Sequence, residues 1–171
     1  MTDPSQLIAN ATSRSAGAIG PRALVPRIVG EIASPDMTLL DFGAGKEAIH
    51  VQMLRAKGLN VTAYDFGANV RLGLHDPDAL SRQYDLVYAS NVLNVQSSLE
   101  MLHNTVAQIA AATKDDGRVV VNLPREPRKC ADVTVTLLRQ ILEEHGLSSL
   151  QLVGGNGGAP VFLATKHTKH V

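Results

Sequence analysis

Residues 37–67 read MTLLDFGAGKEAIHVQMLRAKGLNVTAYDFG: an apolar run, a tight Gly-x-Gly turn, an amphipathic segment and a second apolar run. The first apolar run, 38–40, suits a strand of a parallel sheet that is buried on both faces, and it ends in Asp41. Gly43 and Gly45 allow positive φ angles and let backbone N–H groups approach a ligand. This order is typical of a βαβ unit that binds a nucleotide.

The second half of the stretch predicts a helix and a further strand. Apolar residues recur at helical spacing between Ala48 and Arg55, and Gly58 is the predicted C-terminal stop of this helix. The strand predicted at 61–64 is followed by Asp65. An acidic side chain at this position of a βαβ unit can accept hydrogen bonds from a ribose diol.

The motif from Asp41 to Glu47 resembles the first motif of class I S-adenosylmethionine (SAM) dependent methyltransferases, an acidic residue followed by x-Gly-x-Gly-x-Gly. The acid at Asp41 separates this motif from the dinucleotide fingerprint, which lacks a strand-terminal acid just before its glycines. Glu47 stands where the family has its third glycine. The resemblance extends from the residues before Met37 to Pro127, about three quarters of the chain.

Composition indicates an ordinary globular protein. The chain has 171 residues, of which 44% are hydrophobic and 19% charged, and its formal net charge is zero. The molecule as a whole is therefore not attracted to DNA or to acidic membranes. The single cysteine, Cys130, fits a reducing compartment, no apolar run is long enough to cross a membrane, and the N-terminus lacks a signal peptide core. We therefore expect a cytoplasmic monomer or homodimer.

The remaining periodicity predicts a single SAM-binding α/β domain over residues 21–165, between a flexible segment or lid at 1–20 and a frayed tail at 166–171. Pro26 is expected to kink or break the first helix. The short segment after Asp65 is expected to form a loop or single turn and then a short strand near 70–72. Helices are further predicted at 21–32, 99–113 and 131–145, strands at 84–90, 118–122, 150–153 and 161–165, a turn at 115–117 and a hairpin loop at 154–158.

These elements predict a three-layer, doubly wound α/β fold with a mostly parallel sheet. The hairpin makes the final strand antiparallel, and the second crossover is shortened. The start of the strand at Tyr84-Asp85 resembles the family's fourth strand, and the strand from Arg118 resembles its fifth. This is the Rossmann-like fold that the resemblance to methyltransferases implies.

Predicted cofactor contacts lie at the carboxyl ends of the strands, because ligands of doubly wound sheets bind there. By resemblance to the family, the residues that contact SAM are Asp41, Gly43, Gly45, Lys46, Asp65, Phe66, Asp76, Ser90 and Asn91. In this set, Asp65 is expected to hold the ribose and Phe66 to pack on adenine. Asp76 either reaches the adenine amino group or caps a helix ahead of Pro77, and the two roles are compatible.

No strong general base is visible, and the candidates for a catalytic role are His75, Asn91 and Asn94. A histidine at a strand end such as His75 is either a base or a structural group. The two asparagines can hold an acceptor without titrating, or they can cap a helix or close a turn. The segment from Ser90 to Leu93 lacks the prolines and the aromatic residue of the Asp/Asn-Pro-Pro-Tyr/Phe motif of base amino methyltransferases.

The stiff loop at 123–129 carries three cations, Arg125, Arg128 and Lys129. Arginine can bind phosphate or carboxylate through two hydrogen bonds, so this loop is a predicted clamp for an anionic substrate. The alternative is a solvated surface loop with an internal Arg–Glu pair. No metal site is predicted, since the two histidines of the tail do not make one.

Three functions follow from these observations. The first is a SAM-dependent methyltransferase for an unidentified acceptor, with a nucleotide or nucleic acid as the anionic candidate. The second is a SAM-binding protein that does not transfer methyl, such as a SAM-cleaving enzyme, a sensor or a degenerate partner subunit, which Glu47 and the short crossover favour. The third is a nicotinamide-dependent oxidoreductase, against which Asp41 argues. The pattern is also similar, more loosely, to short phage-encoded methyltransferase-like proteins, which act in the host cytoplasm.

Overall fold

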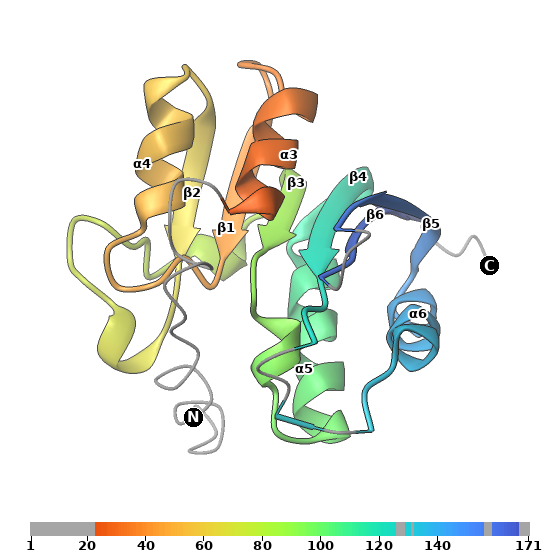
Figure 1. Cartoon of the computed structure of the whole chain (residues 1–171). Helices are drawn as coiled ribbons and strands as arrows, with labels where there is room; N and C mark the ends of the chain where they lie inside the picture. The colour runs from red at the N-terminus through yellow and green to blue at the C-terminus, as the bar shows by residue number, and fades with distance from the viewer. Residues whose placement is uncertain (1–22, 126–128, 131, 156–158, 168–171) are drawn as a thin grey trace.

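The structure, a computed structural model, describes residues 23–125, 129–130, 132–155 and 159–167. Six strands form one sheet in the order β2-β1-β3-β4-β6-β5 (Figure 1). The pairs β1–β2, β1–β3 and β3–β4 are parallel, whereas β6 runs antiparallel to both β4 and β5. The strands are β1 (Thr38–Phe42), β2 (Asn60–Tyr64), β3 (Tyr84–Ala89), β4 (Thr113–Asn122), β5 (Leu147–Gly154) and β6 (Val161–Lys166). The predicted mostly parallel sheet with an antiparallel final strand is confirmed.

Helices cover both faces of the sheet, which makes the three predicted layers. One face carries α3 (Leu24–Ile32) and α4 (Ile49–Ala56), and the other carries α5 (Leu99–Ala111) and α6 (Val135–Glu144). Three short 3₁₀ turns are η1 (Gly67–Asn69), η2 (Ala79–Ser81) and η3 (Leu93–Val95).

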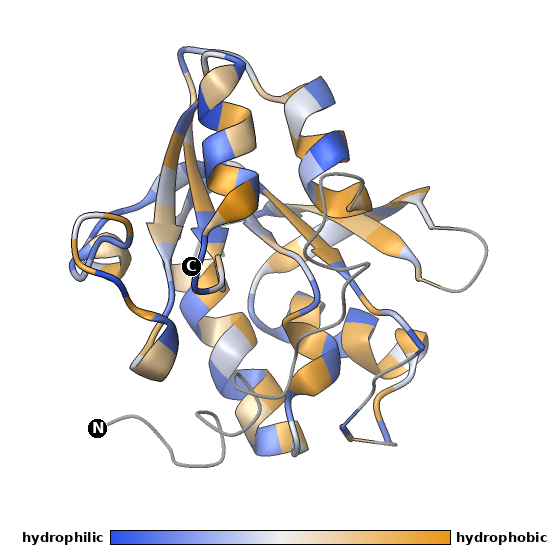
Figure 2. Ribbon diagram, turned by 60° about the vertical axis from the view of Figure 1, so that its left-hand side comes forward, coloured by the Kyte–Doolittle hydropathy of each residue, from blue (hydrophilic) through white to orange (hydrophobic). Residues whose placement is uncertain are grey.

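Side chains alternate between the two faces of the sheet along each strand, so the hydrophobic core is divided into two clusters. In β3, Leu86 and Tyr88 pack with α3 and α4, while Val87 and Ala89 pack with α5 and α6. Successive strand residues point to opposite faces, so a strand buried on both sides must be apolar throughout. Figure 2 shows hydrophobic residues concentrated in the strands, with hydrophilic residues interspersed along the helices.

The predicted kink at Pro26 is wrong. Pro26 is the third residue of α3, within the first turn of this helix, and it is buried. The N–H groups of the first helical turn have no partner within the helix, so a proline there removes no hydrogen bond. The helix therefore runs unbroken to Ile32.

Two further local predictions are corrected. No strand forms at 70–72 within the described residues; this stretch follows η1 and leads into a turn, and the side chain of Leu72 is exposed. The predicted turn at 115–117 lies inside β4, where Asp116 takes a φ of +64° and the pairing register with β3 shifts. The Asp-Asp-Gly sequence marks an irregularity within the strand and not its beginning.

The ends of the domain also differ from the predicted bounds. Helix α6 begins at Val135, where Thr134 accepts a hydrogen bond from the N–H of Leu137. Strand β6 includes Lys166, whose Nζ donates to the carbonyl of Thr113 at 2.7 Å. The predicted lid at 1–20 and the tail from residue 168 lie outside the described residues. No described helix is both long and apolar enough to cross a membrane.

The N-cap of α5 provides a test of this local structure. Ser98 Oγ accepts a hydrogen bond from the N–H of Met101 at 3.1 Å. Replacing Ser98 with alanine should lower the free energy of unfolding by about 1 kcal/mol. Urea denaturation measures this change, and Ser97→Ala is the control because Ser97 does not cap a backbone N–H. Equal losses in both variants would contradict the assignment of the cap.

Candidate active site

The glycine loop after β1 is bound to the end of β2 by its backbone. The N–H groups of Gly43 and Ala44 both donate to the carbonyl of Tyr64 at 2.9 Å. Gly43 has a φ of +87°, and a Cβ there would lie 2.6 Å from Cγ2 of Val92. Glycine is therefore required here by backbone conformation and by packing, independent of any ligand.

Asp65 links the loops that follow β1 and β2. Its Oδ2 accepts from the N–H of Gly45 at 2.7 Å, and its Oδ1 accepts from the N–H of Phe66 at 2.8 Å. The N–H groups of the glycine loop, which the sequence predicts to approach a ligand, therefore donate hydrogen bonds within the protein. A Cβ at Gly45 would have no neighbour within 4 Å, so this residue leaves open space beside the loop.

His75 holds the third loop of the site against the glycine loop. Its Nδ1 accepts from the N–H of Arg71 at 3.0 Å, so its Nε2 carries the proton and donates to the carbonyl of Gly45 at 2.7 Å. The residue is 5% exposed, and both of its ring nitrogens are occupied. This arrangement favours the structural role of His75 over that of a base.

Asp41 is buried near the end of β1, just before the glycine loop. It is the fourth residue of β1, is 1% exposed and accepts a hydrogen bond from the hydroxyl of Tyr88 at 2.9 Å. Burial raises the pKa of Asp41 to about 7; the Tyr88 hydrogen bond opposes this shift, and the negative charge of Asp65 adds to it. Tyr88 was not predicted from the sequence as a site residue.

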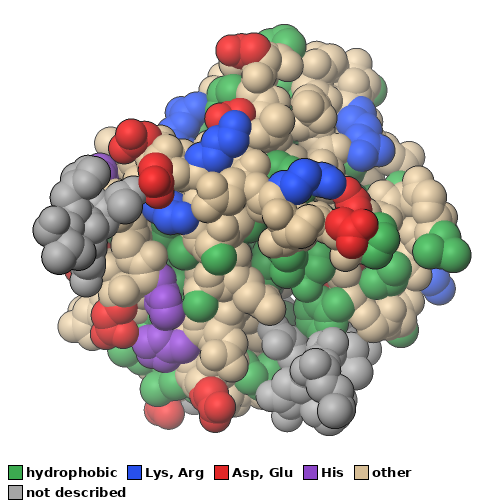
Figure 3. Space-filling model, turned by 180° about the vertical axis from the view of Figure 1, so that it is seen from behind, with side chains coloured by type: hydrophobic (Ala, Val, Ile, Leu, Met, Phe, Trp, Pro, Cys, Tyr) green, Lys and Arg blue, Asp and Glu red, His purple; other side chains and the backbone are tan. Residues whose placement is uncertain are grey.

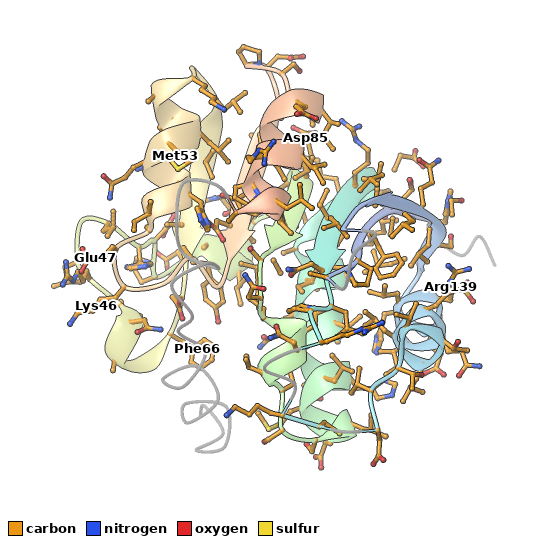
Figure 4. All side chains as sticks on the ribbon, viewed as in Figure 1. Lys46, Glu47, Met53, Phe66, Asp85 and Arg139 are labelled. Carbon is orange, nitrogen blue, oxygen red and sulfur yellow. The ribbon has the colours of Figure 1, made fainter. Side chains whose placement is uncertain are left out.

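Phe66 lies at the carboxyl edge of the sheet, with Lys46 and Glu47 on the neighbouring loop and Asp85 at the opposite end of the strands (Figure 4). Its ring centroid is 6.4 Å from that of Tyr64. The ring is half-buried, so one part of it remains accessible. Lys46 is exposed, and Glu47, in place of the third glycine, forms an exposed ion pair with Arg71 at 3.0 Å.

Asp76 forms a turn ahead of η2 and is not its N-cap, because the N-cap residue of η2 is Asp78 and no side chain caps this turn. Its Oδ1 accepts from the N–H of Asp78, and its Oδ2 lies 2.6 Å from Nη2 of Arg82. The hydrogen bond with Arg82 holds the pKa of Asp76 below its usual range. The predicted N-cap role of Asp76 is therefore wrong, whereas its predicted contact with adenine stays a prediction.

Two asparagines join the ends of β3 and β4. The N–H of Asn91 donates to Oδ1 of Asn122 at 2.7 Å, and Nδ2 of Asn122 donates back to Oδ1 of Asn91 at 3.0 Å. Asn91 also donates through Nδ2 to Oγ of Ser90, and its φ is +59°, which asparagine tolerates. Asn122 was not predicted as a site residue, because its pairing with Asn91 arises only in the tertiary structure.

The basic loop adjoins this asparagine pair through η3. The N–H of Lys129 donates to the carbonyl of Asn94, a buried residue of η3, at 2.8 Å. Arg125 and Lys129 are exposed, and no described carboxylate forms an ion pair with either. Arg128 lies outside the described residues.

The carboxyl edge therefore combines the buried carboxyl of Asp41, the carboxylate of Asp65 bound to backbone donors, a half-buried aromatic ring and neutral amides. Such a site can bind a nucleoside and position a second molecule, which suffices where the bound reagent is itself reactive.

Comparison with known proteins agrees with this geometry. A family model described as a methyltransferase domain matches residues 20–151. No curated protein sequence gave a match. A solved structure of a TehB-like SAM-dependent methyltransferase from Corynebacterium glutamicum is similar, with 19% identity, a TM-score of 0.64 and coverage of 91% of both chains.

Two further solved structures are similar over nearly the whole chain. Magnesium protoporphyrin IX methyltransferase from Synechocystis, with bound SAM, has 14% identity and a TM-score of 0.65 and covers 96% of this chain and 98% of its own. The 1,6-didemethyltoxoflavin N1-methyltransferase from Burkholderia thailandensis, with S-adenosylhomocysteine, has 19% identity and a TM-score of 0.65 and covers 98% and 92%. These likenesses show the fold. Because the family model spans more than half of the chain, this protein belongs to the methyltransferase domain family and is a methyltransferase.

Proposed function

We propose that this methyltransferase binds SAM at the glycine loop and transfers its methyl group to a small acceptor that carries an anionic group. The observation that carries the proposal is the pair of hydrogen bonds that the carboxylate of Asp65 accepts from the N–H groups of Gly45 and Phe66. It places a carboxylate between the glycine loop and an accessible aromatic ring, where a nucleoside would lie.

The residues present fit SAM. A carboxylate offers about four lone-pair positions, so Asp65 can accept from ribose hydroxyls beside its two backbone donors. Phe66 offers a half-buried ring for adenine, and Gly45 leaves room at its Cβ position. When bound, SAM supplies an electrophilic methyl group on a sulfonium. Asp41 would supply a buried carboxyl just before the glycine loop, and Asn91 and Asn122 would provide a neutral surface that can orient an acceptor.

The anionic acceptor is proposed from the basic loop. Arg125 and Lys129 are exposed, and the backbone bond from Lys129 to Asn94 keeps the loop beside the ends of β3 and β4. A small acceptor is favoured because proteins of similar extent act, by their names, on magnesium protoporphyrin IX and 1,6-didemethyltoxoflavin. The phage-like origin, the cytoplasmic location and the oligomeric state stay predictions.

Calorimetric titration with SAM and with NAD tests the cofactor. We expect saturable binding of SAM and of S-adenosylhomocysteine and at least about tenfold weaker binding of NAD, because the N–H groups of Gly43, Ala44 and Gly45, which would bind a pyrophosphate, donate within the protein. Tight NAD binding without SAM binding would contradict the proposal. SAM binding without transfer to any acceptor would instead support the non-transferring alternative.

Charge reversal tests the basic loop. The double variant Arg125→Glu, Lys129→Glu should raise KM for an anionic acceptor by about 10- to 100-fold, since two charge-assisted contacts are lost, and should leave SAM affinity unchanged. Transfer of labelled methyl from SAM to a panel of nucleotides and aromatic carboxylates measures KM. The control is Arg139→Glu, on the exposed side of α6 (Figure 4). Equal KM values in the double variant and the control would exclude the loop from acceptor binding.

A further inference from the structure

Gly45 is held on both sides by side chains from two different loops. Its N–H donates to Oδ2 of Asp65 at 2.7 Å, and its carbonyl accepts from Nε2 of His75, also at 2.7 Å. The φ of Gly45 is +78°, which is only one of the backbone conformations that a glycine can adopt. The two hydrogen bonds therefore select one shape of the glycine loop from those that its sequence allows.

His75 is itself fixed to the end of β2. Its Nδ1 accepts from the N–H of Arg71 at 3.0 Å, and its own backbone N–H donates to the carbonyl of Arg71 at 3.0 Å. The N–H of the next residue, Asp76, donates to the carbonyl of Ala63, in β2, at 2.9 Å. His75 is 5% exposed, so its ring cannot turn away from the glycine loop without breaking buried hydrogen bonds. Through His75, the sheet sets the position of Gly45.

A second side-chain contact between these loops lies in solvent. Nη1 of Arg71 is 3.0 Å from Oε2 of Glu47, and the two side chains are 45% and 58% exposed. Ion pairs at this exposure contribute little, because water screens the charges and both side chains lose freedom. The buried imidazole of His75 is therefore the stronger link between the glycine loop and the segment that follows β2.

We propose that His75 is a positioning residue for the cofactor, which fixes the backbone at Gly45 in the shape that binds SAM. This inference rests on the proposed function and adds to it a residue that acts without touching SAM. Both ring nitrogens of His75 are occupied within the protein, so its effect reaches the cofactor through Gly45. A loop that already has its bound shape loses less freedom when the ligand binds, and its affinity is higher for that reason.

Calorimetric titration with SAM on variants of His75 tests the proposal. Glutamine can place its amide nitrogen near the position of Nε2 and donate to Gly45, whereas asparagine is too short and retains only an acceptor near the position of Nδ1. His75→Ala and His75→Asn should each weaken SAM binding about tenfold, and His75→Gln should bind SAM within about threefold of the wild type. A role limited to holding the fold together would not rank these variants by their donor to Gly45.

Two control variants change side chains outside this contact. Glu47→Gln removes the exposed ion pair and should change SAM affinity by less than about twofold. His103→Asn alters a histidine contact on the back of the molecule (Figure 3), where Nδ1 of His103 lies 3.2 Å from Nε2 of His145. This pair belongs to α5 and the end of α6, on the face of the sheet opposite α4, so SAM affinity should not change. Thermal melts verify that each variant folds, and the comparison of His75→Gln with His75→Asn decides if the alanine variant does not melt cooperatively.

NMR of the imidazole nitrogens provides a readout that does not depend on SAM. Because Nδ1 of His75 accepts and Nε2 donates, the spectrum of histidine-labelled protein should show a ring with its proton on Nε2, and His75→Gln should lack this signal. A proton on Nδ1 would overturn the proposal, because Nε2 could then not donate to Gly45. Wild-type protein that binds SAM no more tightly than His75→Asn would overturn this proposal alone and leave the proposed function standing. Wild-type protein that binds no SAM would overturn both.

Discussion

The variant Asp65→Ala is expected to weaken SAM binding by at least about a hundredfold and to lower the free energy of unfolding by about 3 kcal/mol. Removing the Asp65 carboxylate has two consequences. It eliminates the proposed ribose contact, and it leaves the N–H groups of Gly45 and Phe66, which now donate at 2.7 and 2.8 Å, without their carboxylate acceptor. Each hydrogen bond to a charged group contributes about 1.5 to 3 kcal/mol, so a combined effect of this size follows.

A matched control separates loss of stability from loss of the site. Asp85 also accepts a backbone hydrogen bond, from the N–H of Thr38 at 2.7 Å, but it lies at the opposite edge of the sheet (Figure 4). Asp85→Ala should lower stability and leave the dissociation constant of SAM unchanged. Urea denaturation and calorimetry measure the two quantities on both variants. If Asp65→Ala bound SAM as tightly as the control, the nucleoside would not lie beside Asp65.

The variant Asp41→Asn is expected to make the protein more stable at pH 8, by up to about 4 kcal/mol. Burial raises the pKa of Asp41 to about 7, well above the ordinary value of 3.8. The folded state therefore binds a proton that the unfolded state has released. The stability that this proton provides is fully present below about pH 4 and is lost as pH rises through about 7. An asparagine is neutral at every pH and can still accept from Tyr88.

The measurement is the free energy of unfolding from urea denaturation between pH 4 and pH 8 without SAM. The difference between Asp41→Asn and the wild type should grow with pH up to about 7 and then level off, which isolates the titration of Asp41 from that of other groups. Tyr88→Phe removes the hydrogen bond that opposes the pKa shift, so it should move the loss of stability to higher pH. A difference that is independent of pH would show that Asp41 is ionised in the folded protein throughout this range.

Sequence alone was sufficient where local patterns determine local structure. The unit from β1 through the glycine loop and α4 to β2 was predicted because its apolar runs, glycines and acids occur at characteristic spacings. The antiparallel closing strand followed from a similarly short pattern, the predicted hairpin loop at 154–158. The failures were also local. Pro26 was assigned to the middle of a helix predicted from residue 21, whereas α3 begins at Leu24. This difference of three residues moves the proline into the first turn, where it does not break the helix.

The pairings that shape the site were decided only by tertiary structure. Tyr88 reaches Asp41 across 47 residues, Asn122 reaches Asn91 across 31, and His75 reaches the carbonyl of Gly45 across 30. Each contact depends on strand register and on the packing of loops, which no spacing in a single sequence encodes. The chemistry of the carboxyl edge could be predicted because strand ends of a parallel sheet meet there. The sequence could not show which side chains would pair with or bury one another. Burial and the distances between partners arise only when the layers of the fold pack together.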